Sequence, residues 1–217
     1  MPLVSILLLE IVPFLLLAGA GSRSRGPADP GHAREMAMAA GALVQAGWFA
    51  AGGHIPCSRR EAVVRSILTR APQTVSEAVC GPKSVRPGLK TFLHFAHNTF
   101  AEPAELPMLL EMRRFLRMAS RLRRRQELLE RLADGLRQAT RLEREDAVGR
   151  LSALMTDLAA ALGEREAAAG DRAIAWLYGL RAAWLWQSLG GRGIPTAYAP
   201  PHLCRAASQL LKESARG

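Results

Sequence analysis

The sequence predicts an all-α protein: a single-domain bundle of six to eight helices, one of them long and rich in arginine. Alanine, leucine, arginine and glutamate dominate the composition, and these residues favour helix. Apolar residues recur three and four positions apart over most of the chain after residue 36, the period of a helix with one buried face. No run of alternating β-branched and polar residues marks a strand. At 217 residues the chain is long enough to enclose one core.

The first 35 residues differ in composition from the rest of the chain. An apolar run over residues 3–20 contains Glu10 and Pro13, and a segment rich in glycine, proline and arginine follows it without helical period. Helical periodicity begins only near Met36. We therefore divide the chain into an extension, residues 1–35, and a helical domain, residues 36–217.

Three origins of the extension remain open. In the first, the translation start is assigned too early and the true start is Met36 or Met38. In the second, the apolar run is a membrane anchor, since its length is near the ~20 residues of a spanning helix, although a carboxylate and a proline interrupt it. In the third, the run is a signal peptide cleaved after residues 18–20, although no Lys or Arg precedes it.

Helix caps and glycine or proline breaks divide the helical domain into elements. Residues 38–51 predict a helix of small residues that ends at the glycine pair 52–53. Residues 58–61 and 74–77 each match the capping box, in which Ser or Thr and Glu bond the free amides at a helix start. Apolar spacing predicts a further helix over residues 88–100.

The long helix is predicted over residues 108–145, because an apolar seam recurs there at close to seven-residue spacing. A compact element is shorter than this, so we expect a kink or break near Gly135 or after Asp146. The remaining elements are a helix over residues 148–162, a polar linker over 163–171, a helix that stops at Gly190, a loop over 190–201, and a last helix.

Positive charge is concentrated at one place in the long helix. The formal net charge is +10, from 29 basic and 19 acidic residues, and residues 113–125 hold seven arginines and no acid. Such a strip attracts phosphate, anionic lipid or an acidic partner, or it is the solvated face of an arginine-rich protein. Phe115 is the one aromatic residue within it and belongs to the apolar seam. We take as candidate surface Arg113, Arg114, Arg117, Arg121, Arg124 and Arg125.

A second candidate motif lies in the helix before Gly190. Arg181 falls on the same helical face as apolar residues, and an unpaired buried charge is costly. We expect Arg181 to bond an acid or helix-end carbonyls close to the Gly190 turn. Trp184 and Trp186 belong either to the core, with one ring of the tryptophan cluster exposed, or to a partner hot spot or an interface-seeking aromatic belt. Gly190 and Gly191 are read as a helix stop.

No catalytic, cofactor or metal site is predicted, and we expect no enzyme. The pairs His94/His97 and His54/Cys57 lack a third ligand placed by spacing. The glycines from Gly190 follow a helix, whereas phosphate-binding loops precede one. No nucleophile motif or paired-carboxylate arrangement occurs. Three widely separated cysteines, without a Cys-x-x-Cys pair, favour a reducing compartment.

Three blocks of the helical domain resemble the bacterial HflD family (high frequency lysogenization protein). The resemblance covers roughly residues 36–211, and its most specific part is the last block. These blocks are AGALVQA with GH at residues 40–46 and 53–54, VRPGLKTF at residues 85–92, and GLRAAWLWQ with GG at residues 179–187 and 190–191.

The resemblance implies an all-helical, non-catalytic protein attached peripherally to the cytoplasmic face of the inner membrane. It implies an adaptor that binds and sequesters a regulatory protein, a phage CII-type transcription activator in that family. Another client is needed in a host without such a phage. A basic helical nucleic-acid-binding protein, linked to RNA, is the alternative. The sequence leaves the client and the oligomeric state open.

Overall fold

The computed structural model describes residues 29–69, 72–97, 103–164, 168–195 and 199–216, and they confirm the all-α prediction. Within these ranges there is no strand, and nine α-helices and one short 3-10 turn, Pro103–Glu105, account for the elements. The helices are α2 (Pro30–Gly52), α3 (Cys57–Leu68), α4 (Val75–Ala78), α5 (Arg86–His97), α6 (Leu106–Leu122), α7 (Gln126–Ala139), α8 (Arg144–Ala161), α9 (Gly170–Ser188) and α10 (Pro201–Arg216).

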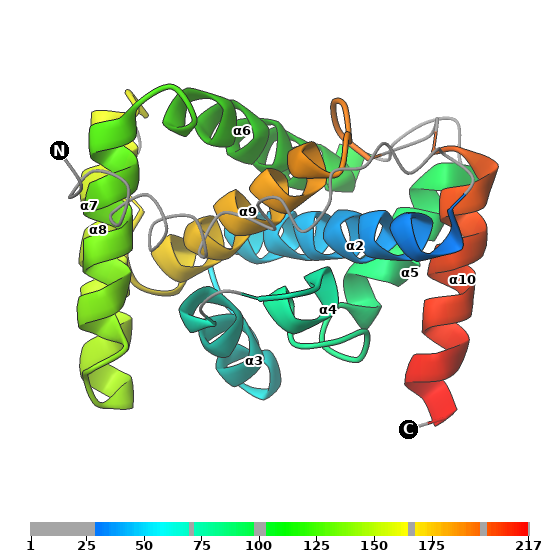
Figure 1. The fold of residues 1–217 in the computed structure, drawn as a ribbon, viewed down its shortest axis with the longest axis horizontal. Helices are drawn as coiled ribbons and strands as arrows, with labels where there is room; N and C mark the ends of the chain where they lie inside the picture. The colour runs from blue at the N-terminus through cyan, green and yellow to red at the C-terminus, as the bar shows by residue number, and fades with distance from the viewer. Residues whose placement is uncertain (1–28, 70–71, 98–102, 165–167, 196–198, 217) are drawn as a thin grey trace, which may run out of the picture.

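Helices α2 and α9 pack against each other at the centre of the molecule, and the other helices surround them (Figure 1). Helix α6 covers both central helices on one side, and α3 packs on α9 from the other. The α7–α8 hairpin closes one end, where α8 contacts α9, and α5 and α10 close the other against α2. Both central helices are buried nearly all round, residues 37–47 in α2 and 173–186 in α9, which explains their almost continuous apolar sequence.

None of the helices that the structure describes is both long enough and apolar enough to cross a membrane.

Glycines allow the central helices to approach their neighbours. A Cβ at Gly88 of α5 would overlap the carbonyl oxygen of Gly41 in α2, and a Cβ at Gly179 of α9 would overlap the ring of Phe115 in α6. Any larger residue at either position would push a pair of helices apart. Both glycines lie within the blocks that carry the family resemblance.

The first described helix begins earlier than residue 36. Helix α2 starts at Pro30, and the side chain of Asp29 accepts a hydrogen bond from the Gly31 amide at 2.9 Å. Aspartate at the N-cap followed by proline is a favourable helix start. Arg34 in the first turns pairs with Glu213 of α10 through two bonds of 2.7 and 2.5 Å. The apolar run at residues 3–20 lies outside the described residues.

The predicted long helix is two helices, α6 and α7, and this division raises the number of helices above eight. The first break falls at residues 123–125, where the Arg124 amide donates to the Arg121 carbonyl at 3.2 Å and the Arg125 amide to that of Leu122 at 3.0 Å. The second separates Ala139 from Arg144. The expected breaks are wrong: residue 135 is buried inside α7, and residue 146 lies in the first turn of α8. Packing of α8 on both α7 and α9 requires the hairpin.

The two capping-box predictions have different outcomes. At residues 74–77 the prediction is confirmed, since the Thr74 hydroxyl accepts from the Glu77 amide at 3.2 Å and the Glu77 carboxylate from the Gln73 amide at 2.7 Å. At residues 58–61 it is wrong, because α3 already starts at Cys57 with no side-chain cap. Glu61 there pairs with Arg65 one turn later.

Candidate anion-binding face of helix α6

The arginines of residues 113–125 divide into an inward set and an outward set. Helix α6 buries one face, which carries Met108, Met112, Phe115, Met118 and Leu122. Arginines beside this face reach carboxylates and carbonyls of α8, α9 and the segment between them, and arginines opposite it reach solvent. The inward set, Arg114, Arg121, Arg123 and Arg125, therefore makes contacts within the protein, and the outward set forms free surface.

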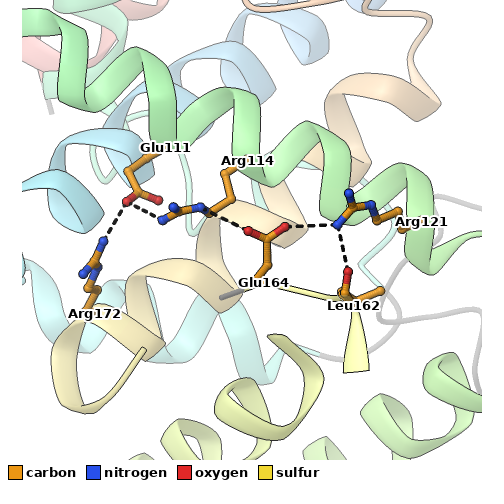
Figure 2. Close-up of polar contacts among 6 residues, drawn as sticks. All are labelled: Glu111, Arg114, Arg121, Leu162, Glu164 and Arg172. Carbon is orange, nitrogen blue, oxygen red and sulfur yellow. Dashed lines mark hydrogen bonds and ion pairs between the residues drawn. The ribbon is translucent and has the colours of Figure 1, made fainter. Parts of the chain in front are cut away.

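Two carboxylates, the buried Glu111 and the partly buried Glu164, bind arginines of the inward set (Figure 2). Glu111, 6% exposed, accepts from Arg114 at 2.9 Å and from Arg172 of α9 at 3.0 Å. Glu164, just after α8, lies 3.3 Å from both Arg114 and Arg121. The network links α6 to the end of α8 and the start of α9. The arginines neutralise the two carboxylates, whose charges would be costly to bury without partners.

Trp176 of α9 forms the apolar floor of this network. Its ring is fully buried, and the guanidinium groups of Arg114 and Arg172 lie 4.8 and 5.6 Å from its centroid. Cation–π contact adds to the ion pairs, and it is strongest when the groups are desolvated. Arg114 and Arg172 thus contact the Trp176 indole as well as the carboxylate of Glu111.

The turn after α6 places two further arginines on helix ends. Arg123 donates to the Trp184 carbonyl at 3.0 Å and the Ser188 hydroxyl at 2.9 Å, and its guanidinium lies 4.5 Å from the Trp184 ring centroid. Burial lowers the pKa of Arg123. Arg125 donates to the Ala161 carbonyl at 2.7 Å, at the end of α8. Cations at helix C-termini are favourable because free carbonyls gather there.

The outward set consists of Arg113, Arg117 and Arg124. All three are exposed, and none of their side chains has an ion pair or hydrogen bond with any residue that the structure describes. Of the six predicted surface arginines, Arg114 and Arg125 are therefore intramolecular contacts. Arg121 belongs to the inward set, since it donates to the Leu162 carbonyl at 2.8 Å, although its side chain stays 49% exposed.

A groove of about 440 Å³ runs beside these arginines. One wall is fixed, because Gln187 of α9 donates to the Leu116 carbonyl at 3.0 Å and to the Ser120 hydroxyl at 3.1 Å. No acidic residue lines the groove; Arg121 is paired with Glu164 beside it, whereas the charges of Arg113, Arg117 and Arg124 are not compensated by a described partner. The lining residues are Arg113, Leu116, Arg117, Ser120, Arg121, Arg124, Gln187, Gly193 and Ile194.

The outer face of α6 continues toward its N-terminus as an apolar surface. Leu106 and Leu110 are 55% and 56% exposed, unusual values for leucine in a helix with a buried face. Their spacing to Arg113 and Arg117 is four, three and four residues, so all four lie on one face. The face is therefore apolar at one end and basic along the rest.

Arg181 is buried at the core of the fold, with 1% exposure. It donates to the carbonyls of Ile67 and Thr69 at 3.2 and 3.0 Å, at the C-terminal end of α3. Bonding to helix-end carbonyls is confirmed, but the expected proximity to the Gly190 turn is wrong, because the carbonyls belong to α3. Burial lowers the pKa of Arg181 to about 10.

The glycine pair ends α9 as predicted, and it also places Trp186. Gly190 has a positive φ of 87°, and a Cβ at Gly191 would overlap the indole of Trp186. The Trp186 Nε1 donates to the Gly193 carbonyl at 3.0 Å. Trp184 and Trp186 are 6% and 5% exposed, so both are core residues, and the expected exposed ring is wrong. This turn also supplies the Gly193 edge of the groove.

The histidine pairs take no part in a cluster. Within the described ranges no group of three or more His, Cys, Asp and Glu is close enough to hold a metal ion. His94 Nε2 lies 3.6 Å from Glu105 Oε1, which pairs α5 with the 3-10 turn before α6.

Sequence reasoning missed the carboxylates that hold the inward arginines. Glu111 lies three residues after Met108 and four before Phe115, so helical spacing places it on the buried face. An acid at such a position is the signal that predicts a buried arginine partner. Glu164 gave no signal, because it falls in the segment read as a polar linker.

Comparison with models of protein families gave no match. A search of curated proteins gave no match either.

Proposed function

We propose that this protein is a non-catalytic helical adaptor, peripheral on the cytoplasmic face of the inner membrane, that holds a regulatory protein there. The observation that carries the proposal is the outer face of α6: Leu106 and Leu110 are exposed at one end, and Arg113, Arg117 and Arg124 follow without partners in the described chain. Exposed leucines beside uncompensated arginines are typical of a surface that meets anionic lipid.

The electrostatics of this face fit a membrane surface. Each well-placed arginine near an anionic leaflet contributes about 1 kcal/mol, and the attraction falls off within a Debye length. Leucines at the same surface add apolar burial among the lipid headgroups. Neither contribution requires a membrane-spanning helix.

The client rests on the resemblance to the HflD family. That resemblance points to a CII-type transcription activator in a host that carries such a phage, and to another regulatory protein elsewhere. The basic face also suits an acidic or amphipathic client segment, so membrane and client are expected to compete for it. Nucleic acid presents the same phosphate chemistry and is the alternative partner.

Vesicle binding by the full chain tests the membrane part of the proposal. The variant R113Q/R117Q/R124Q is compared with R131Q/R141Q/R205Q, which removes three exposed arginines from other surfaces and matches the change in net charge. We expect the first variant to lose about 3 kcal/mol, roughly a hundredfold, on phosphatidylglycerol vesicles in low salt. The second variant should bind nearly as the wild type does.

Two outcomes would reject the membrane assignment. Equal losses in the two triple variants would show that net charge alone drives binding. Duplex or transfer RNA binding that is tighter than vesicle binding at the same salt, and that the α6 variant abolishes, would favour the nucleic-acid alternative.

A further inference from the structure

A shallow groove lies along the basic face of α6. Arg113, Arg117, Arg121 and Arg124 lie on successive turns of the helix and the turn after it, and all four line one hollow of about 440 Å³. That volume is in the range of small-molecule sites. Arg113, Arg117 and Arg124 have no side-chain partner among the described residues, so their guanidinium groups remain available to a ligand in this hollow.

Part of the groove is held in place before any ligand arrives. Arg121 is fixed by the Leu162 carbonyl at 2.8 Å and by Glu164 at 3.3 Å. Ser120 donates to the Leu116 carbonyl at 2.9 Å and accepts from Gln187 at 3.1 Å. A rigid wall facing three arginines without partners reduces the ordering that binding requires.

The donor set indicates the charge of the ligand. The lining includes four arginines and no acidic residue, and one of these arginines, Arg121, is already paired with Glu164. Arginine forks bond anionic oxygens in pairs, which favours phosphate over a monovalent anion. A phosphate monoester carries about −1.5 to −2 at pH 7 and three acceptor oxygens, and a diester offers less charge.

We propose that this groove is a specific binding site for a phosphate monoester group. The shared chemistry occurs in free phosphorylated small molecules and in the headgroup of phosphatidic acid. The site goes beyond the proposed function, because it requires neither a membrane nor a client protein.

Calorimetric titration of the full chain tests the site with three probes: glycerol 3-phosphate, water-soluble dihexanoyl phosphatidic acid, and sulfate at equal ionic strength. Monoesters should bind at least about tenfold tighter than sulfate near pH 7.5, because sulfate has no carbon substituent to fill the groove. Monoester affinity should also rise from about pH 5 to about pH 7.5, as the second proton with a pKa near 6 is lost. Sulfate binding should stay level over the same range.

Variants separate the groove from general charge. R117Q removes the central exposed arginine and should weaken monoester binding by about tenfold or more, whereas R205Q on α10 should not. R117K keeps the charge without the fork and should lie between the two. Position 117 on α6 and position 205 on α10 are both exposed, so folding, followed by circular dichroism, should be unchanged in all three variants.

The outcomes are distinct for the two proposals. Monoester binding no tighter than sulfate binding, or equal losses in R117Q and R205Q, would overturn the site. Equal affinity for the two monoesters means that the phosphate group is sufficient, and tighter binding of the lipid means that acyl chains contact the groove; both support the site. Monoester binding without binding to vesicles would overturn the membrane proposal and leave the site standing.

Discussion

At the scale of single residues, Arg181 of α9 is a buried charge whose partners determine whether it stabilises the fold. The guanidinium of Arg181 is 1% exposed and spans from α9 to the carbonyls that end α3. Desolvation of a charge is costly, and charged hydrogen bonds to carbonyls offset it. Arg181 thereby fixes α3 against the central helix, so its role is structural.

Arg181→Leu should lower the free energy of unfolding by about 2–4 kcal/mol, because the carbonyls of Ile67 and Thr69 lose their donor in the interior. Urea denaturation measures the change. Arg181→Lys, which keeps one charged donor, should lose less. A leucine variant as stable as the wild type would show that water satisfies these carbonyls.

Tyr178 gives the same region a dependence on alkaline pH. Burial raises the pKa of its phenol above the ordinary value of about 10, with 2% of the side chain exposed. The folded state therefore keeps a proton that the unfolded chain loses, so stability should fall as pH rises above about 10. Arg181 acts in the opposite direction, since burial lowers its pKa.

Tyr178→Phe isolates the phenol from these other groups. Unfolding free energies measured by urea denaturation between about pH 8 and pH 11 should decline less in the variant than in the wild type. Parallel curves for the two proteins would mean that the phenol ionises in the folded state and would contradict the burial argument.

At the scale of elements, close helix approach depends on missing side chains. Gly88 of α5 meets the backbone of α2 at Gly41, and Gly179 of α9 meets Phe115 of α6. The surrounding core is buried on both sides of each crossing, so it offers no room for displacement. The inward arginines also link α6 to α8 and α9 through ion pairs and hydrogen bonds.

Gly88→Ala should destabilise the protein by about 2–3 kcal/mol, since its Cβ would overlap the Gly41 carbonyl and α5 must move. Gly149→Ala is the matched control, because that position lies inside α8 with nothing within 4 Å of an added Cβ. The control should stabilise by up to about 1 kcal/mol through helix propensity. Thermal unfolding of both variants measures the difference, and equal effects would refute the crossing argument.

At the scale of the whole molecule, paired charges lie between the helices, and unpaired arginines lie on the outer face of α6. The carboxylates of Glu111 and Glu164 lie where α6, α8 and α9 meet, and they pair with Arg114, Arg121 and Arg172. The outward arginines have no acidic partner and share one face of α6. This face therefore concentrates part of the net charge of +10 at one place on the surface. The basic groove and the exposed leucines lie on that same helix.

The sequence alone predicts the class of the fold and most of its helices, because helical period, glycine stops and the Thr74 cap are local signals. It also predicts that Arg181 must find carbonyls or an acid, since any buried charge must. The helix start at Asp29 and Pro30 carried a local signal too, and it was overlooked because the preceding segment is irregular.

Only the tertiary structure decided which arginines face solvent. The break at residues 123–125 carries no glycine or proline, and it forms because Arg123 and Arg125 bond the ends of α9 and α8. Helical spacing cannot place Glu164 beside Arg114 and Arg121, because Glu164 is more than forty positions from each of them. Only the packing of α6 against the end of α8 brings these residues together. Local propensity determines the elements, and contacts distant in sequence determine the surface.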